Sequence, residues 1–388
     1  MRLLVILPRF PYPIEKGDKL RAYHQLRILS LHHQIHLVAL SHQKVDDQDK
    51  AKVSPYCETI DIVRTGWLCM GFNLLKVLLS GLPFQVGYYY SAKARKQVDM
   101  VVKSFKPEHI YCQLLRTAEY GYSYNIPATL DYQDVFSKGV ERRMPKVKGV
   151  MKYLLRMEYK RLLRYERAIF DKFDHKTIIS VPDREQIPHP DRGEIVVVPN
   201  GVDHAYFKPM DKPVTHELVF TGNMGYPPNI NCAVYLGEQV LPLIHKILPG
   251  VRLMIAGATP HAKVKALASE HITVTGWVDD MRECYAGAKI FLAPMLMGTG
   301  LQNKLLEAMS MQLPCITSTL CNLALKAEAG AEILIGDSPD QVAEQVLLLL
   351  QNQEFANKVA RAGYDFVHQH YGWEGATQGL LKVIESKQ

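Results

Sequence analysis

The sequence predicts an α/β protein built of two doubly wound parallel sheets. Short apolar runs, typical of buried strands, alternate with longer stretches of helical period along the 388 residues. This alternation starts twice, and a Pro- and charge-rich stretch at 208–213 separates the two series. At about 100–200 residues per domain, the length fits two domains. We expect the halves to face each other across a cleft, the usual ligand site of open α/β sheets.

The first half opens with the continuous apolar run Leu3–Leu7, as expected for a strand that is buried on both faces. A polar loop at 15–19 and a helix with apolar positions from Leu20 to Leu29 follow. Further strands of this half are expected at 36–40, 109–113, 128–131 and 177–181. Strands of the second half are expected at 218–222, 253–257, 272–274, 290–293 and 315–317.

Composition limits the class of protein and its compartment. Apolar residues make up 47% and charged residues 22%, which supports folded cores and excludes a disordered chain. The seven cysteines include no C-x-x-C pair, so they fit a reducing compartment and provide no zinc site. The apolar run near the N-terminus is too short for a signal peptide, and no run reaches the length of a spanning helix. We therefore expect a cytoplasmic protein.

The strongest local motif is a strand, a Gly-rich loop containing Gly298 and Gly300, and a helix that begins within 301–303. The free N–H groups and the positive dipole end of such a helix suit a phosphate. Lys304 in the first turn adds a point charge for a diphosphate. Glu307 lies on the same helix face, where its carboxylate can accept from two ribose hydroxyls. The alternative is that Lys304 and Glu307 form an ordinary surface pair.

The first strand–loop–helix unit offers a second candidate site. Gly17 allows a close approach of the backbone to a ligand, and Lys19 and Arg21 supply positive charge beside it. The sequence contains no G-x-G-x-x-G here and no G-x-x-x-x-G-K-[ST] anywhere, which excludes the usual dinucleotide and P-loop sites.

Two carboxylates follow the strand at 128–131. Asp131 and Asp134 can order sugar hydroxyls or stabilise an oxocarbenium-like centre. Asp134 is equally suited to cap a helix, and we favour that role for it, whereas for Asp131 we favour a functional role.

The cluster His32, His33 and His36 has no spacing of a known metal site, and we assign it to the polar end of a helix, with no metal. The segment 138–176 carries 13 Lys/Arg and 5 Asp/Glu, and its cations alternate with apolar residues. Such a basic amphipathic helix fits an anionic membrane surface, and the 67–90 segment, rich in Trp and Tyr, would add an interfacial contact. The alternative is a solvated helix that packs on its own domain. No nucleic-acid motif accompanies the charge.

Several motifs, taken in order, resemble those of glycosyltransferase family 4, and the resemblance runs nearly end to end. In the first half they are P-Y-P at 11–13, K-G-D-K-L-R at 16–21 and V-P-N-G-V-D at 198–203. In the second half they are F-T-G-N-M at 220–224 with Tyr226, Pro228 and Asn229, I-A-G at 255–257, T-G-W-V at 275–278, L-L-E-A-M at 305–309 and Y-G-W-E at 371–374. The pattern is most similar to the bacterial subgroup that builds exopolysaccharide and other surface glycans.

The resemblance implies the GT-B fold, in which two Rossmann-like domains face a central cleft. Residues 1–205 would form the acceptor-binding domain and 206–370 the nucleotide-sugar-binding domain, while a helix at 371–388 would cross back to the first domain. It also implies transfer of a sugar to a hydroxyl with retention at the anomeric carbon, without a metal or a cofactor. The donor would be a UDP- or GDP-sugar, and the acceptor a lipid-linked or surface-polysaccharide glycan at the inner face of the membrane.

The resemblance also assigns residues. The catalytic residues would be Asp131, Lys304 and Glu307, with electrostatic stabilisation of the leaving diphosphate. The nucleotide-sugar would contact Gly17, Arg21, Gly222, Asn223, Thr299, Gly300, Leu301, Gln302, Asn303, Lys304 and Glu307.

The chain departs from the family pattern at three positions: Thr299 replaces the first acid of Glu-x7-Glu, Asn223 replaces an Arg, and Asp131 replaces a His. Two alternatives stay open: a nucleotide-sugar epimerase of the same fold, and a non-catalytic partner that binds a nucleotide-sugar.

Overall fold

The computed structural model describes residues 1–65, 77, 80–297 and 300–386, and the chain forms two compact units. The first unit comprises Met1–Pro199 and Ala376–Gln388, and the second comprises Asn200–Gly375. The boundary therefore falls after Pro199 rather than after residue 205, and the stretch 208–213 lies inside the second unit. Most of the last helix belongs to the first unit.

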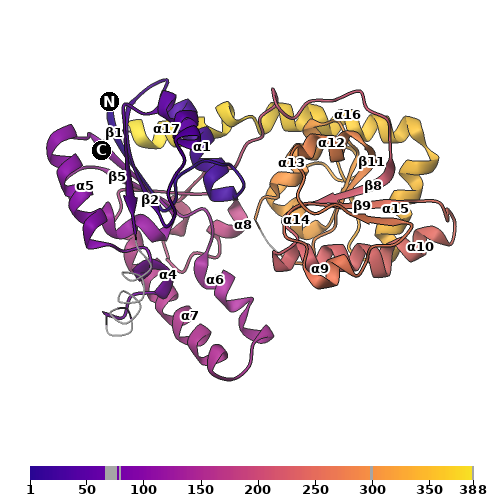
Figure 1. Ribbon diagram of the computed structural model, residues 1–388, viewed down its shortest axis with the longest axis horizontal. Helices are drawn as coiled ribbons and strands as arrows, with labels where there is room; N and C mark the ends of the chain where they lie inside the picture. Colours follow the sequence, from indigo (N-terminus) through magenta and orange to yellow (C-terminus); the bar gives the residue numbers. More distant parts are fainter. Residues whose placement is uncertain (66–76, 78–79, 298–299, 387–388) are drawn as a thin grey trace. The chain divides into compact units, whose positions relative to one another are not determined.

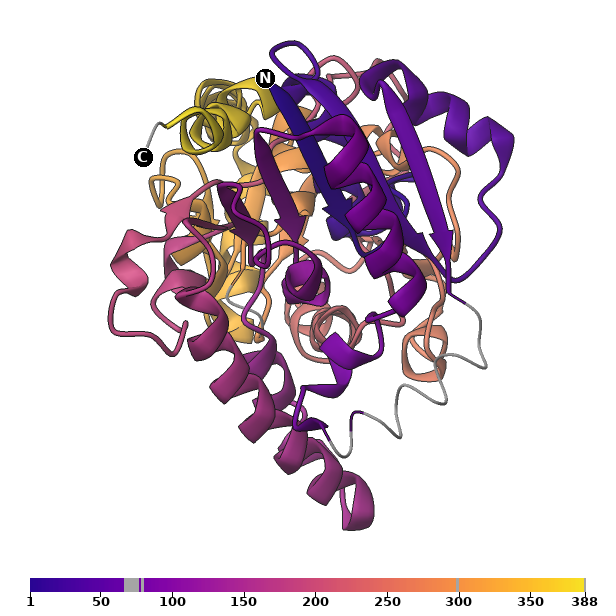
Figure 2. The same cartoon turned by 90° about the vertical axis from the view of Figure 1, so that its left-hand side faces the viewer.

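The first unit contains a seven-stranded sheet in the order β3-β2-β1-β4-β5-β6-β7, in which all neighbouring strands are parallel. Its strands are β1 (Arg2–Leu7), β2 (Gln34–Ser41), β3 (Thr59–Arg64), β4 (His109–Gln113), β5 (Ala128–Asp131), β6 (His175–Ile178) and β7 (Val196–Val197). Its α-helices are α1 (Gly17–Leu29), α2 (Asp47–Val53), α4 (Phe84–Gly87), α5 (Ala92–Phe105), α6 (Phe136–Glu141), α7 (Gly149–Phe170), α8 (Val181–Arg184) and most of α17 (Trp373–Glu385). Short 3-10 helices lie at Ser54–Tyr56, Leu115–Tyr120, Met144–Lys146 and Arg192–Glu194. The first part of α7 extends beyond the sheet of its own unit (Figures 1 and 2).

The second unit contains a six-stranded parallel sheet in the order β10-β9-β8-β11-β12-β13. Its strands are β8 (His216–Thr221), β9 (Leu253–Ala256), β10 (Ile272–Val274), β11 (Ala288–Ala293), β12 (Cys315–Thr317) and β13 (Leu334–Ile335). Its helices are α9 (Pro227–Tyr235), the π-helical segment Leu236–Val240, α10 (Leu241–His245), α11 (Ala262–Lys265), α12 (Met281–Ala286), α13 (Asn303–Ser310), α14 (Thr319–Leu325), α15 (Pro339–Gln351) and α16 (Gln353–His370).

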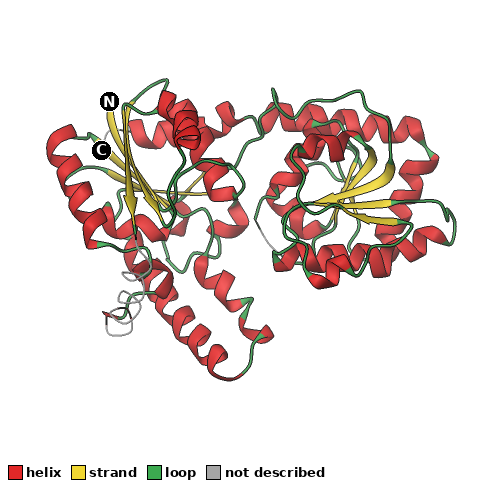
Figure 3. Ribbon diagram, viewed as in Figure 1, coloured by secondary structure: helices red, strands yellow, loops and turns green. Residues whose placement is uncertain are grey.

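These two sheets confirm the predicted doubly wound α/β class. Helices lie on both sides of each sheet (Figure 3). The central strands are therefore covered on both faces, and β4 and β5 are buried along their whole length. Each unit has its own apolar core, which is what allows it to be a separate compact body.

Two kinds of strand were predicted less well. The strand expected at 177–181 ends at Ile178, because Ser180 caps helix α8: its hydroxyl accepts the backbone N–H of Asp183 at 3.2 Å. Strands β3, β7 and β13 were not predicted. The first is an edge strand with only one fully buried residue, and each of the other two spans only two residues.

Candidate functional site

The start of helix α13 in the second unit is uncapped. Gln302 precedes the helix in an extended conformation and makes no side-chain capping bond, since its amide donates to the carbonyl of Gly300 at 3.0 Å. The side chain of Asn303 accepts from Asn200 at 3.0 Å. Residues 300–303 are all partly exposed, so a ligand can reach the positive end of the helix. The predicted site residue Thr299, with Gly298, lies outside the described residues.

Lys304 extends from the first turn of α13 into a half-buried position between β8 and α9. Its Nζ donates to Oδ1 of Asn229 at 2.6 Å and lies 4.6 Å from the ring centre of Phe220. Burial lowers the pKa of Lys304 to about 8. A partly desolvated cation with no carboxylate against it is suited to attract an anionic group.

Gly222 provides the space beside this lysine. A Cβ at this position would lie 2.7 Å from Nδ2 of Asn229 and 3.1 Å from Nζ of Lys304, and its φ of +149° also disfavours other residues. Gly257 approaches even more closely, because a Cβ there would lie 1.8 Å from the carbonyl oxygen of Gly222. The two predicted glycine motifs therefore fit a close approach of two strand ends.

Glu307 lies one turn further along α13 and is held by a different element. Its Oε2 accepts the hydroxyl of Tyr285 at 2.7 Å, and that hydroxyl lies 2.9 Å from Oγ1 of Thr221. Burial raises the pKa of Glu307. Since Lys304 and Glu307 are both half-buried and are held by separate partners, they are not an ordinary surface ion pair.

Asn223 follows Gly222 on an exposed loop and uses its side chain to shape that loop. Its Oδ1 accepts the N–H of Gly225 at 2.9 Å and the hydroxyl of Thr259 at 2.7 Å. Its carbonyl accepts from Asn229, which also contacts Lys304. The structure thus brings the predicted residues Gly222, Asn223 and Lys304 together.

The sequence did not predict Asn229 and Tyr285 as site residues. Asn229 stands in a motif that we used for the resemblance, so that motif was an available signal. Tyr285 has no local signal because its contact joins residues of α12 and α13, which are far apart in the sequence.

The structure places Arg21 and Asp131 in the interior of the first unit, not on a ligand-facing surface. Both side chains have 0% exposure, and Arg21 donates through Nε to Asp131 at 2.7 Å. Asp131 also accepts from Tyr111 at 2.8 Å and from Thr177 at 2.9 Å. A carboxylate with these partners has no oxygen left for a sugar, so the predicted ligand contacts of Arg21 and Asp131 do not fit the structure.

Gly17 is the first residue of α1 rather than part of a preceding loop, and a Cβ there would meet nothing within 4 Å. The histidine cluster is divided: His36 binds Asp61 at 2.8 Å, and His33 lies 3.6 Å from Glu385. Within the described part of the chain, no group of three metal-ligating side chains could hold an ion.

Comparisons with known proteins agree with this geometry. Residues 215–352 match a protein-family model described as Glycosyl transferases group 1. A protein of Klebsiella pneumoniae, described as an uncharacterized 44.6 kDa protein in cps region, is 21% identical over 400 residues, covering 98% of this chain and 99% of its own.

Solved structures share the fold across nearly the whole chain. Sucrose-phosphate synthase from Thermosynechococcus elongatus has a TM-score of 0.72 at 14% identity and covers 98% of each chain. HepE from Anabaena in complex with UDP has a TM-score of 0.71 at 13% identity and covers 100% of each chain. A TarM variant from S. aureus in complex with UDP and two glycans has a TM-score of 0.66 at 9% identity.

The matched domain and this fold define the class: the protein is a glycosyltransferase with the GT-B fold. The matched residues lie within the second unit and contain Gly222, Lys304 and Glu307.

Proposed function

We propose that this glycosyltransferase belongs to family 4 and moves a sugar from a UDP- or GDP-sugar to a hydroxyl of a lipid-linked or surface-polysaccharide glycan, with retention at the anomeric carbon. The observation that carries the proposal is the arrangement of Lys304 and Glu307 at the start of α13, beside Gly222 and within the matched domain. HepE, which has the same fold, was solved with UDP-glucose, and this supports a nucleotide-sugar donor.

In this proposal the chain acts by electrostatics and positioning. Lys304 and the amides of residues 300–303 hold the diphosphate, and the cation stabilises the negative charge that grows on it as the sugar leaves. Glu307, aligned by Tyr285, accepts from the ribose hydroxyls and fixes the nucleotide. The chemistry is proposed to need no metal, since Lys304 supplies the positive charge.

The transfer proposal is tested by incubating the protein with UDP- and GDP-sugars and a bacterial lipid-linked glycan fraction, with and without EDTA. We expect release of one nucleoside diphosphate, an NMR signal of the anomer present in the donor, and the same rate with EDTA. Lys304→Met should lower turnover at least tenfold, whereas Lys358→Met, which removes an exposed lysine of α16, should leave it unchanged. An inverted anomer or a rate abolished by EDTA would contradict the mechanism.

We also propose that the first part of α7 binds the anionic inner face of the membrane. Val150, Met151 and Tyr153 are 76%, 54% and 70% exposed, and the neighbouring Lys152 and Arg156 are exposed too. Exposed apolar residues beside cations favour an anionic bilayer surface, at about 1 kcal/mol per cation. Among the described residues, no helix has the length and apolarity needed to cross a membrane.

The later part of α7 has a different role. Glu158, Arg161 and Leu162 are buried, and Arg161 donates to the carbonyls of Val77 and Leu82 at 2.7 and 3.0 Å. The packing of the basic helix on its own domain therefore holds for these turns. The aromatic segment at 67–90, predicted as an interfacial contact, lies largely outside the described residues.

Co-sedimentation with anionic and zwitterionic vesicles tests the membrane proposal. Met151→Ser with Tyr153→Ser, and separately Lys152→Gln with Arg156→Gln, should each weaken binding to anionic vesicles several-fold, the second in a salt-dependent way. Lys93→Gln with Lys103→Gln on α5 serves as the charge-matched control. Equal sedimentation of all variants would exclude α7 as the contact.

A further inference from the structure

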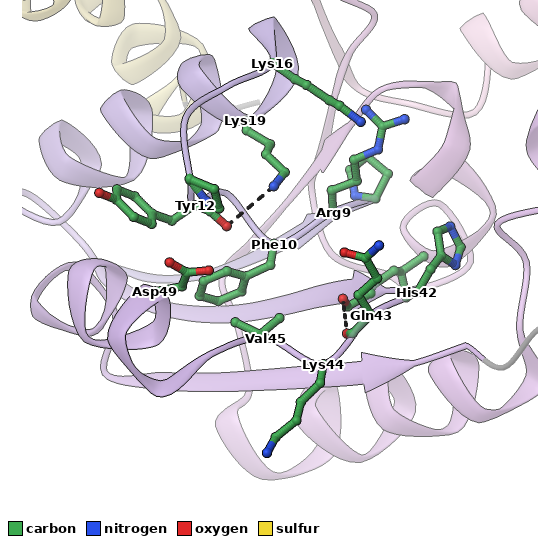
Figure 4. Close-up of a pocket in the computed structure, with 14 residues that line it drawn as sticks. Arg9, Phe10, Tyr12, Lys16, Lys19, His42, Gln43, Lys44, Val45 and Asp49 are labelled. Carbon is green, nitrogen blue, oxygen red and sulfur yellow. Dashed lines mark hydrogen bonds between the residues drawn. The ribbon is translucent and has the colours of Figure 1, made fainter. Parts of the chain in front are cut away.

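A cavity of about 240 Å³ lies in the first unit, where β1 and β2 end and α1 begins. Every residue that lines it belongs to this unit and to the described part of the chain. Figure 4 shows its side chains converging from the loop after β1, the start of α1 and the loop after β2. The proposed donor site, which lies in the second unit, makes no use of them.

Cations dominate the lining of this cavity. Arg9, Lys16, Lys19 and Lys44 line it, against the single carboxylate of Asp49. In Figure 4, Lys16 points toward Arg9 and Lys19 points toward the carbonyl of Tyr12, whereas Lys44 points away. Like charges repel when they are directed toward one place, so this arrangement favours an anion between them.

The two lysines of α1 are available for such an anion. Neither Lys16 nor Lys19 forms an ion pair within 4 Å among the described residues, and the contact of Lys19 with the Tyr12 carbonyl is a long 3.5 Å. Arg9 is held in place by Asp18 at 2.8 Å and by the hydroxyl of Tyr89 at 3.2 Å. The arginine is thus fixed, while the lysines are free to turn toward a ligand.

Two further observations point to a ligand that supplies acceptor atoms. Burial lowers the pKa of Lys19, and the nearby Glu15 and Asp18 oppose this only in part. In the same cavity, Nε2 of His42 is buried and has no hydrogen-bond partner in the described structure, although Nδ1 lies 2.8 Å from the hydroxyl of Thr65. Burial and the neighbouring Arg9 lower the pKa of His42, so the ring is neutral and its unpaired nitrogen suits a neutral hydrogen bond.

We propose that this cavity binds a phosphate group carried by the acceptor, through Lys16, Lys19 and Arg9. The inference rests on the proposed glycosyl transfer and deepens it, because it assigns the acceptor to the class of phosphate-bearing glycans. A phosphate offers several oxygens to several donors at once, which matches three converging cations better than a single carboxylate would. The aromatic side chains of Phe10 and Tyr12 in the same lining provide an apolar wall for the group that carries the phosphate.

The binding test uses inorganic phosphate and glycerol 3-phosphate at low salt, with the full-length protein and calorimetric titration. Lys16→Gln with Lys19→Gln should weaken both ligands at least tenfold, and Lys93→Gln with Lys103→Gln should not change them. Lys304→Met should keep phosphate binding. The proposal is overturned if the parent binds neither ligand, or if Lys304→Met loses the binding that the double variant keeps. Circular dichroism of each variant shows that it is folded.

UDP binding and transfer kinetics separate the two proposals. Lys16→Gln with Lys19→Gln should keep the UDP affinity of the parent and raise the KM for the lipid-linked acceptor, with the donor KM unchanged. A raised donor KM with an unchanged acceptor KM would reassign these lysines to the donor diphosphate. If the parent binds phosphate in this cavity but no nucleotide, the glycosyl transfer proposal fails and the assignment to an acceptor fails with it, although the anion site stands.

Discussion

Lys304 and Glu307 show how one helix turn can hold two side chains with opposite tasks. They share a face of α13, but Lys304 is held by Asn229 and Glu307 by Tyr285. Because each has its own partner, the cation and the carboxylate do not neutralise each other. The spacing of the two residues was predictable from the sequence. Their partners were not, since contacts with α9 and α12 are made only in the folded chain.

The pKa of Lys304 leads to a pH dependence of donor binding. Burial lowers it to about 8, and only the protonated amine attracts a diphosphate. UDP affinity should therefore be constant below pH 7 and fall by about tenfold per pH unit well above pH 8. Titrations of UDP at pH 7 and 9.5 measure this. Lys304→Met should bind weakly and without this dependence, and a flat profile in the parent would contradict the assignment.

At the scale of elements, buried charges connect helices to the sheet of the first unit. The Arg21–Asp131 pair joins α1 to the end of β5, and its members are 110 residues apart in the sequence. Sequence reasoning found both residues but assigned them to a ligand, because a strand-end carboxylate and a helix cation look the same before their pairing is known.

Breaking this pair should destabilise the first unit. Asp131→Asn leaves the buried Arg21 guanidinium without its countercharge, at a cost of about 3–5 kcal/mol. Arg21→Met combined with Asp131→Asn should be less destabilised than the sum of the two single variants. Urea unfolding measures both effects. Additive losses, or an Asp131→Asn loss below about 0.5 kcal/mol, would show that the pair is not coupled.

A second buried carboxylate makes the stability of this unit depend on pH. Burial raises the pKa of Glu166 to about 7, and its Oε2 has no hydrogen-bond partner in the described structure. The folded state therefore binds this proton more tightly than the unfolded chain does. Its contribution to stability is present at about pH 4 and is lost as pH rises to about 7.

Glu166→Gln should remove this loss and raise the unfolding midpoint at pH 8 relative to the parent. Glu58→Gln, at an exposed position, serves as the control and should have no effect. Thermal unfolding at pH 5 and pH 8 makes the comparison. A parent that is more stable at pH 8, with no gain from Glu166→Gln, would contradict the prediction.

At the scale of the whole molecule, two α/β units share one chain, and the last helix returns most of its length to the first unit. The alternation of apolar runs was enough to predict the class, and strands β4, β5, β10 and β12 have the predicted bounds. The edge strands were missed because a short or half-exposed strand leaves no continuous apolar run. The unit boundary was displaced because Pro and charge clusters also occur in surface loops inside a domain.

The central claim is that the second unit holds a nucleotide-sugar through Lys304 and Glu307. The most direct measurement is a thermal-shift screen of the parent, Glu307→Ala and the exposed control Glu344→Ala against UDP-, GDP-, ADP- and CMP-sugars. The account predicts one nucleotide class that stabilises the parent and the control alike, and Glu307→Ala at least tenfold more weakly. Equal stabilisation of all three proteins, or none of the parent, would contradict it.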